Sequence, residues 1–382
     1  MGNPFRPGAI VEPEYFVGRS EEIARFEQYL KNTKDGNPHH LAILGERGIG
    51  KTSLLRYLQH LAKNQRIMVA RIELDPAIKS IEHLVTQILT ELKRSGIAYS
   101  LVDKGAITLK DFFQKYNVAL SLGVLKAGPR QGSEVETKIE FRYKLQEMWD
   151  KVKDKIPAII IMIDEAEQLE QIEGSLHYLR NIFLRLSETH CSYMLILSGK
   201  IGLFREIKEL HSPLARFFTP ITLNPLKPEE VKAAIEKPLK ENGIALEKNV
   251  LNRIIKDSEG HPYVVQVIGY ILFESDKKLI TLNDYNTLKP AFMKHLADQL
   301  FSDMLENSST EEQRILHIIA KKKSDLSLKE ISKKVNKDPT SIGTPLTRLV
   351  ERSCLGRIKR GKYQLFHSLF GEYILSEMEG KD

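Results

Sequence analysis

The stretch Gly45-Glu46-Arg47-Gly48-Ile49-Gly50-Lys51-Thr52 decides the fold of this 382-residue chain. Its glycines, lysine and threonine follow the spacing GxxxxGK[ST], which is the signature of a phosphate-binding loop between a strand and a helix. The flanking sequence agrees, because a short apolar run ends at Leu44 and a helical pattern of apolar residues continues to about Lys63. We therefore expect a buried strand, a glycine-rich loop and a helix, in that order.

The residue types of this loop suit a nucleoside triphosphate. Glycines let successive backbone N–H groups turn toward phosphate oxygens. Lys51 would place its charge on the β- and γ-phosphates, and the Thr52 hydroxyl would bind magnesium. The predicted ligand is ATP with Mg²⁺, and the predicted binding set is Gly45, Glu46, Arg47, Gly48, Ile49, Gly50, Lys51, Thr52 and Ser53.

A second motif lies further along the chain, where the apolar run Ala158 to Ile163 ends in Asp164-Glu165. A carboxylate at the carboxyl end of a buried strand faces the ligand crevice of an open parallel sheet. We expect Asp164 to hold magnesium and Glu165 to polarise the attacking water. The alternative is that Asp164 only caps the helix that follows.

The remaining apolar runs set the fold class. Strands are expected at 67–72, 158–163, 193–197 and 221–223, with helices at 80–93 and 174–187 between them. Continuous apolar strands that alternate with helices predict an α/β P-loop core, a parallel sheet with helices on both faces. The stretch 96–136 fits this alternation poorly. We interpret it as an insertion of unassigned role that contains a strand pair at 119–125.

The character of the chain changes after Pro225. Helices are expected at 228–240, 248–257, 262–273 and 282–301, and then three helices, a hairpin with a basic turn and a last helix. That last order is typical of a winged helix-turn-helix. The predicted domains are a P-loop ATPase core (1–224), a helical lid (225–304) and a winged-helix domain (305–382).

The C-terminal module is basic, with 15 Lys and Arg against 10 Asp and Glu over 310–382, out of a net charge of +7 for the whole chain. An apolar stripe of Ile342, Leu346, Leu349 and Val350 would face inward on its third helix. The candidate contacts to duplex DNA are Thr340, Ser341, Thr344, Arg348, Arg357, Lys359, Arg360 and Lys362. A basic patch of this kind binds phosphates, but a protein-docking surface and a solvated basic face stay open.

Composition excludes several classes of protein. The chain is 42% hydrophobic and 28% charged, which is typical of soluble globular proteins, and no run approaches the length of a membrane span. The N-terminus lacks a secretory h-region. Cys191 and Cys354 read as buried thiols in a reducing compartment, so we expect a cytoplasmic protein. His39, His40 and His177 have no metal-ligand spacing and are interpreted as structural.

Taken together, Phe16-Val-Gly-Arg19, the helix after it, and the two Walker-type motifs resemble the AAA+ and STAND branch of P-loop ATPases. The opening Asn3-Pro-Phe-Arg6 adds a likeness to the archaeal-type ATPase family, which is similar to origin-recognition initiators. The resemblance extends over nearly the whole chain.

This resemblance implies roles for four residues. Val17 and Gly18 would line the adenine pocket, although they also fit an N-terminal strand and turn. Ser198 would be the polar sensor of the γ-phosphate, or otherwise a helix N-cap. Arg216 would be an arginine finger reaching a neighbouring subunit of a homo-oligomer. Otherwise it is a surface arginine, and Arg205 is the competing candidate.

The sequence departs from the AAA+ pattern at the start of the third lid helix. Instead of a sensor arginine it has Gly260-His261-Pro262, which resembles the GxP signature of the STAND branch, whose proline packs on adenine. Pro262 is also a common first residue of a helix. The expected function is slow, Mg-dependent ATP hydrolysis coupled to DNA binding or remodelling. The rival is a STAND-like switch that docks a protein partner. A third reading, an inactive scaffold, conflicts with the intact Lys51, Asp164 and Glu165.

Overall fold

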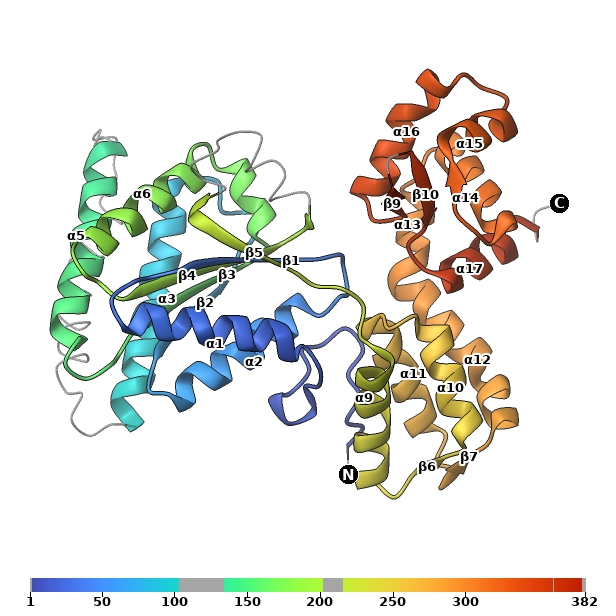
Figure 1. Cartoon of the computed structure of the whole chain (residues 1–382), viewed down its shortest axis with the longest axis horizontal. Coiled ribbons are helices and arrows are strands. Elements are labelled where there is room, and N and C mark those ends of the chain that lie inside the picture. The colour runs from blue at the N-terminus through green and yellow to red at the C-terminus, as the bar shows by residue number, and fades with distance from the viewer. Residues whose placement is uncertain (1, 103–133, 202–215, 360, 380–382) are drawn as a thin grey trace. The chain divides into compact units, whose positions relative to one another are not determined.

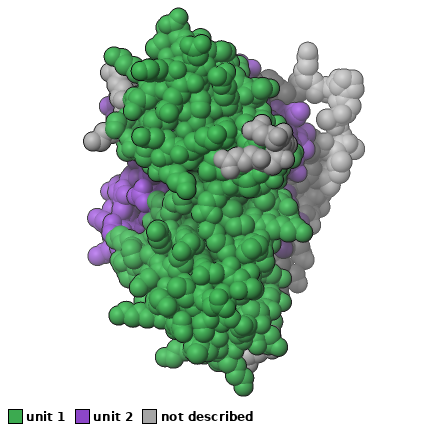
Figure 2. Space-filling model, turned by 90° about the vertical axis from the view of Figure 1, so that its right-hand side faces the viewer, with its two compact units in different colours: residues 1–18, 46–50, 225–382 green, residues 19–45, 51–224 purple. Residues whose placement is uncertain are grey.

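The computed structural model describes residues 2–102, 134–201, 216–359 and 361–379. They form two compact units, drawn in different colours in Figure 2. Unit 1 comprises residues 1–18, 46–50 and 225–382, and unit 2 comprises residues 19–45 and 51–224. The phosphate loop therefore belongs to unit 1 between Glu46 and Gly50 and to unit 2 at its two ends. The division into three domains stays a prediction.

Unit 2 is built on a five-stranded parallel sheet with the order β2-β3-β4-β1-β5 (Figure 1). The strands are β1 (His40–Leu44), β2 (Met68–Glu73), β3 (Ile159–Asp164), β4 (Tyr193–Gly199) and β5 (Phe218–Thr222). Strands β1, β3 and β4 are buried along their whole length. The predicted parallel α/β core is confirmed, because such continuous apolar strands need cover on both faces.

Helices cover both faces of this sheet. They are α1 (Ser20–Lys34), α2 (Lys51–Asn64), α3 (Ile81–Val102), α5 (Glu134–Val152) and α6 (Ser175–Glu188), with a 3₁₀ turn η2 (Ala166–Gln171) after β3. Helices α3, α5 and α6 share one apolar core with the inward residues of β1, β3 and β4. Helix α2 contacts β2 and β4, and helix α1 contacts β4. Because side chains alternate along a strand, residues such as Met162 and Ile196 face the side opposite to Ile161 and Leu195.

Three predicted boundaries in unit 2 were wrong. Helix α3 continues through Gly96 to Val102, and α5 begins at Glu134, so the ends of the expected insertion are helical. The predicted strand pair at 119–125 lies outside the described residues. Strand β5 begins at Phe218, three residues before the expected start, because its pairing partner is the whole of β1 from His40 to Leu44.

The described part of unit 1 has one apolar core of its own, with buried residues from Phe5 to Ile374. The elements of unit 1 up to residue 306 are η1 (Pro13–Tyr15), α9 (Pro228–Glu241), β6 (Ala245–Leu246), α10 (Lys248–Ser258), α11 (Pro262–Glu274), β7 (Leu279–Ile280), α12 (Leu282–Leu296), a π-helical turn η3 (Ala297–Phe301) and α13 (Ser302–Glu306). The N-terminal segment packs on them, since Phe5 is 1% exposed and lies over Gly269 of α11. Gly269 leaves the space that the Phe5 ring fills.

The C-terminal part of unit 1 consists of helices and a small antiparallel sheet with the order β8-β10-β9. Its elements are α14 (Thr310–Lys322), β8 (Leu326–Ser327), α15 (Leu328–Val335), α16 (Pro339–Glu351), β9 (Leu355–Lys359), β10 (Lys362–Leu365) and α17 (Ser368–Glu379). Reciprocal capping boxes start two of the helices, with Ser309 and Glu312 at α14 and Ser327 and Glu330 at α15. Across the described parts of the chain, no helix has the length and apolar character that a membrane span requires.

Candidate functional site

Three predicted site residues of unit 2, Asp164, Glu165 and Ser198, lie at the carboxyl ends of the neighbouring strands β3 and β4. Strand β4 lies between β1, which leads into Gly45, and β3, which ends in Asp164. The register pairs Ile43 with Ser198, and Gly45 N–H donates to the Gly199 carbonyl at 3.2 Å. Asp164 and Ser198 also point to the same side of the sheet, because each is one residue past a core-facing neighbour. The sheet thus brings these side chains together.

Lys51 begins helix α2, and its side chain extends back toward the carboxyl end of β1. Its Nζ donates to the Gly45 carbonyl at 3.1 Å. Burial lowers the pKa of Lys51, and the carboxylates of Glu165, Glu167 and Asp164 oppose that shift. Thr52 and Ser53 follow in the first turn and are half-buried. The ammonium group is therefore held at an acidic edge and lacks full hydration.

Asp164 and Glu165 differ in their surroundings. Asp164 is 1% exposed, and its Oδ1 accepts the Glu165 N–H at 3.1 Å. Glu165 has φ 52° and heads the turn η2, in the left-handed region that non-glycine residues seldom adopt. Burial raises the pKa of Glu165, the Glu167 and Asp164 carboxylates raise it further, and Lys51 opposes them. A half-buried carboxyl group with a raised pKa suits proton transfer.

Sequence reasoning missed two charged residues at this edge. The Oε1 of Glu167 lies 3.8 Å from Lys200 Nζ, and the Glu167 side chain is 14% exposed. Each of them follows a predicted site residue by two positions, Glu167 after Glu165 and Lys200 after Ser198. No motif spacing identifies Glu167 and Lys200, because they lie close together only as a result of the pairing of β3 with β4.

Ser198 presents an unsatisfied hydroxyl at the strand edge. It is fully buried, and its Oγ has no hydrogen-bond partner within the described ranges. A buried polar atom without a partner is costly. The position therefore suits a group that bonds a ligand, as the resemblance implied, and Ser198 lies within β4, so it is not a helix N-cap.

The residues at this edge fit a magnesium nucleotide. Mg²⁺ prefers a few carboxylate and hydroxyl oxygens together with phosphate oxygens and water, and Asp164 and Thr52 supply donors of that kind. The described residues contain no group of three or more His, Cys, Asp or Glu side chains that could enclose a metal by themselves. A metal held partly by a nucleotide agrees with this donor set.

Unit 1 holds the rest of the loop together with the residues predicted to contact adenine. Gly48 and Gly50 have φ of 75° and 91°, so the loop uses the left-handed conformations that glycine permits. A Cβ added at Gly50 would lie 3.9 Å from Pro262 Cγ. Gly18, with φ 76°, lies against the Glu230 carboxylate, and Val17 packs on the unit 1 core. Pro262 is the first residue of α11, as expected for an N1 proline.

The predicted arginine finger is at the surface. Arg216 is exposed, just before β5, and Arg205 lies outside the described residues. Arg19, in contrast, is 5% exposed and donates from Nη1 to the Asn224 carbonyl. Arg19 therefore connects the start of α1 to the segment that follows β5, which is a structural role.

The candidate nucleic-acid residues occupy α16 and the hairpin after it. Ile342, Leu346 and Leu349 are buried, and Val350 is half-buried. The exposed candidates are Thr340, Ser341, Thr344, Arg348, Arg357 and Lys362. Arg357 lies over the Tyr363 ring, with 5.8 Å from Cζ to the ring centre, and Lys362 Nζ pairs with Asp325 at 2.7 Å. Arg360 and the side chain of Lys359 lie outside the described residues.

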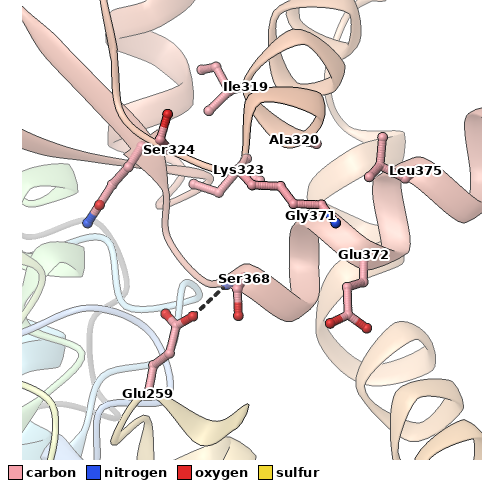
Figure 3. Close-up of a pocket in the computed structure, with 11 residues that line it drawn as sticks. Glu259, Ile319, Ala320, Lys323, Ser324, Ser368, Gly371, Glu372 and Leu375 are labelled. Carbon is pink, nitrogen blue, oxygen red and sulfur yellow. Dashed lines mark hydrogen bonds between the residues drawn. The ribbon is translucent and has the colours of Figure 1, made fainter. Parts of the chain in front are cut away.

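A separate cavity of about 280 Å³ lies in unit 1 beside α14, β10 and α17 (Figure 3). Its wall combines apolar residues such as Ile319 with Glu259, Lys323 and Glu372. The Glu259 carboxylate accepts the Ser368 N–H at 3.1 Å, as the dashed line in Figure 3 marks. None of the predicted nucleotide or DNA contacts lines this cavity.

His40, one of the three histidines interpreted as structural, lies in the core of unit 2. His40 is 5% exposed, and its Nδ1 accepts the Leu195 N–H at 3.0 Å. Burial lowers the pKa of His40 to about 3, so the ring is neutral. Cys191 and Cys354 are buried free thiols, and burial raises the pKa of Cys354 to about 11.

Comparison with known proteins places this site in a family. Residues 8–367 match the family model described as Novel STAND NTPase 1. An uncharacterised HTH-type transcriptional regulator of Methanocaldococcus jannaschii is 23% identical over 375 residues, which are 94% of this chain and 88% of that protein.

Two solved structures share the fold. A Walker-type ATPase of Pyrococcus abyssi has a TM-score of 0.66 at 18% identity, over 97% of this chain and 98% of that one. The ORC2 protein of Aeropyrum pernix, in ADPNP–ADP complexes, has a TM-score of 0.61 at 14% identity, over 99% and 98%.

Proposed function

This chain belongs to the Novel STAND NTPase 1 family and has the fold of archaeal Walker-type and origin-recognition ATPases, and from that premise we propose that it binds ATP with Mg²⁺ and hydrolyses it slowly. The observation that carries the proposal is the gathering of Lys51, Asp164, Glu165 and Ser198 at one edge of the unit 2 sheet. A lysine at the end of the phosphate loop, with two carboxylates and a buried hydroxyl at the ends of neighbouring strands, matches the needs of phosphoryl transfer to water.

Each residue has a role in this proposal. The loop amides of 46–50 and the Lys51 ammonium bind the phosphates, and Thr52 and Asp164 hold Mg²⁺. The metal supplies positive charge that offsets the charge of the phosphates. Glu165 orients the attacking water and accepts its proton, for which its raised pKa is suited. The Ser198 hydroxyl donates a hydrogen bond to the terminal phosphate.

Adenine and subunit contacts complete the proposal. Val17, Gly18 and Pro262 contact the adenine. Arg216 of a neighbouring copy reaches the γ-phosphate in a homo-oligomer, which its exposed position before β5 supports. An arginine fork spreads charge over phosphoryl oxygens.

The C-terminal part of unit 1 is proposed to be a winged helix-turn-helix that binds duplex DNA. Three helices followed by a β9–β10 hairpin support the assignment. The exposed polar face of α16, with Thr340, Ser341, Thr344 and Arg348, supports contact with DNA. The name of the Methanocaldococcus relative, an HTH-type transcriptional regulator, also supports a DNA-binding role. Filter binding of duplex DNA with and without ATP separates this function from a switch that docks a protein.

A hydrolysis assay tests the ATPase proposal. Wild-type protein should release phosphate from ATP with Mg²⁺ and not with excess EDTA. Glu165→Gln should bind ATP with similar affinity and hydrolyse it at least about 100-fold more slowly, because general-base catalysis contributes about 10²–10⁴-fold. The matched control is Glu173→Gln, an exposed carboxylate on the same segment, which should keep wild-type turnover. Equal rates for Glu165→Gln and wild type would rule out Glu165 as the base.

A further inference from the structure

His261 is hydrogen-bonded to the phosphate loop, from which it is 214 residues distant in the sequence. Its Nε2 lies 3.2 Å from the Arg47 carbonyl oxygen, and both residues belong to unit 1. A carbonyl oxygen can only accept, so Nε2 carries the proton and donates. His261 is 5% exposed, and burial, followed by the neighbouring His367, lowers its pKa to about 3. The ring is therefore neutral, with one fixed donor.

Residues 261–263 also lie so close to Gly48 that no side chain fits there. A Cβ added at Gly48 would lie 2.8 Å from His261 Cε1 and 3.2 Å from Tyr263 Cβ. Gly48 must therefore lack a side chain both for its φ and for the closeness of the ring. The histidine ring and the loop backbone are in direct contact.

The backbone of His261 is itself fixed from two sides. The Leu226 N–H donates to the Gly260 carbonyl at 2.8 Å, and the His261 N–H donates to the Ser258 carbonyl at 2.7 Å. The same Ser258 carbonyl accepts from His367 Nε2 at 3.0 Å, while His367 Nδ1 accepts the Leu369 N–H at 3.1 Å. His261 is thus anchored to the start of the helical part and to the C-terminal part of unit 1.

The hydrogen bond from His261 determines how one loop peptide is oriented. A trans peptide is planar, and its C=O and N–H point in opposite directions. Because the Arg47 carbonyl points to His261, the Gly48 N–H points to the opposite side of the loop. Amides that face one side of a glycine-rich loop are what bind phosphate oxygens.

We propose that His261 is a positioning residue for nucleotide binding, which holds the Arg47–Gly48 peptide in the orientation that offers the Gly48 amide to a phosphate. This inference rests on the proposed nucleotide site. It gives the middle residue of Gly260-His261-Pro262 a role of its own, since His261 acts on the loop through a backbone carbonyl. The loop reaches its binding shape before the ligand arrives, which reduces the ordering cost of binding.

The test compares two replacements of His261 in the full-length protein. His261→Phe keeps the ring volume against Gly48 and removes the donor. His261→Gln loses the ring but keeps an N–H donor at nearly the Nε2 position. ADP and ATP affinities are measured by calorimetry with Mg²⁺, and urea unfolding without nucleotide shows whether each variant is folded.

We expect His261→Phe to weaken ADP and ATP binding about tenfold, which corresponds to about 1.4 kcal/mol, and His261→Gln to stay within about threefold of wild type. Hydrogen exchange of the 45–53 peptide in the free protein should be faster in His261→Phe than in His261→Gln. If His261 acted only through packing, the order would be reversed, with Phe the better replacement. If Phe does not fold, His261→Asn is compared with Gln, because Asn is one methylene too short and should bind more weakly.

The outcomes separate the two proposals. If wild type binds nucleotide and His261→Phe binds equally well, or better than His261→Gln, the positioning role is wrong and the nucleotide site stands. If wild type binds neither ADP nor ATP, the proposed function fails and this inference fails with it.

Discussion

Replacing Gly260 with alanine should destabilise unit 1 by about 2–5 kcal/mol. Gly260 has φ 73°, and a left-handed backbone costs about 1–2 kcal/mol for a residue with a Cβ. An added Cβ would also overlap the carbonyl oxygen of Leu226 and approach its nitrogen to 3.0 Å. Relief of that overlap requires the loss of the hydrogen bond from Leu226 N to Gly260 O, which costs about 1–3 kcal/mol when it leaves a polar group unpaired.

Gly243 provides a matched control in the same unit. Its φ is 75°, and an added Cβ would meet no atom within 4 Å, so Gly243→Ala should cost only the backbone term of about 1–2 kcal/mol. Urea unfolding followed by far-UV circular dichroism measures both variants. If Gly260→Ala lowers the free energy of unfolding no more than Gly243→Ala does, the contact with Leu226 is not the reason for glycine at position 260.

Three further predictions follow from charges and ionisation. Arg216→Ala mixed with Lys51→Ala should recover ATPase activity that neither has alone, because an arginine finger contributes about 10³–10⁵-fold; failure of two folded, associating variants to complement would contradict a shared site. Burial lowers the pKa of His40 and His261 to about 3, so the unfolded chain binds more protons than the native one between about pH 6.5 and 3, and stability falls as pH falls through that window. Each histidine should lower the free energy of unfolding by about 2 kcal/mol at pH 5 relative to pH 7.5. In His40→Gln, urea unfolding should show a smaller decrease between these two pH values than in wild type. An equal decrease would contradict the burial of His40 as a neutral ring. Arg357→Ala should flatten the dependence of log K for duplex DNA on log salt by about 0.9, and an unchanged slope would mean that Arg357 does not meet phosphate.

The local parts of this fold were readable from the sequence. Ile159 to Ile163 is an uninterrupted apolar run, so its burial and strand character could be predicted, and so could the strand–loop–helix order around Lys51. Helix α5 was not predicted, because its charged residues are spread along its length and obscure its apolar stripe. The helix predicted over 80–93 ends too early and the predicted insertion begins at Gly96, whereas α3 continues through Gly96 to Val102.

The candidate site could be predicted only in part, because strand order and long-range contacts leave no local pattern. Asp164 and Glu165 stand out as acidic residues after an apolar strand. Glu167 is equally visible in the sequence, but its proximity to Lys200 depends on β4 lying beside β3. The bond between His261 and the phosphate loop joins segments 214 residues apart, which no spacing rule detects.

Calorimetric titration of ATP with Mg²⁺ into wild type and Lys51→Ala tests the central claim most directly. Lys51 reaches the Gly45 carbonyl at the start of the loop and lies among three carboxylates, so its removal takes away the positive charge that faces the phosphates. We predict a saturable, one-site isotherm for wild type and a loss of affinity of at least about 100-fold for a folded Lys51→Ala protein, consistent with about 1.5–3 kcal/mol for a charged hydrogen bond together with the unpaired charge left behind. Equal ATP affinity of the two proteins, or no binding by wild type, would contradict the assignment of this loop as a nucleotide site.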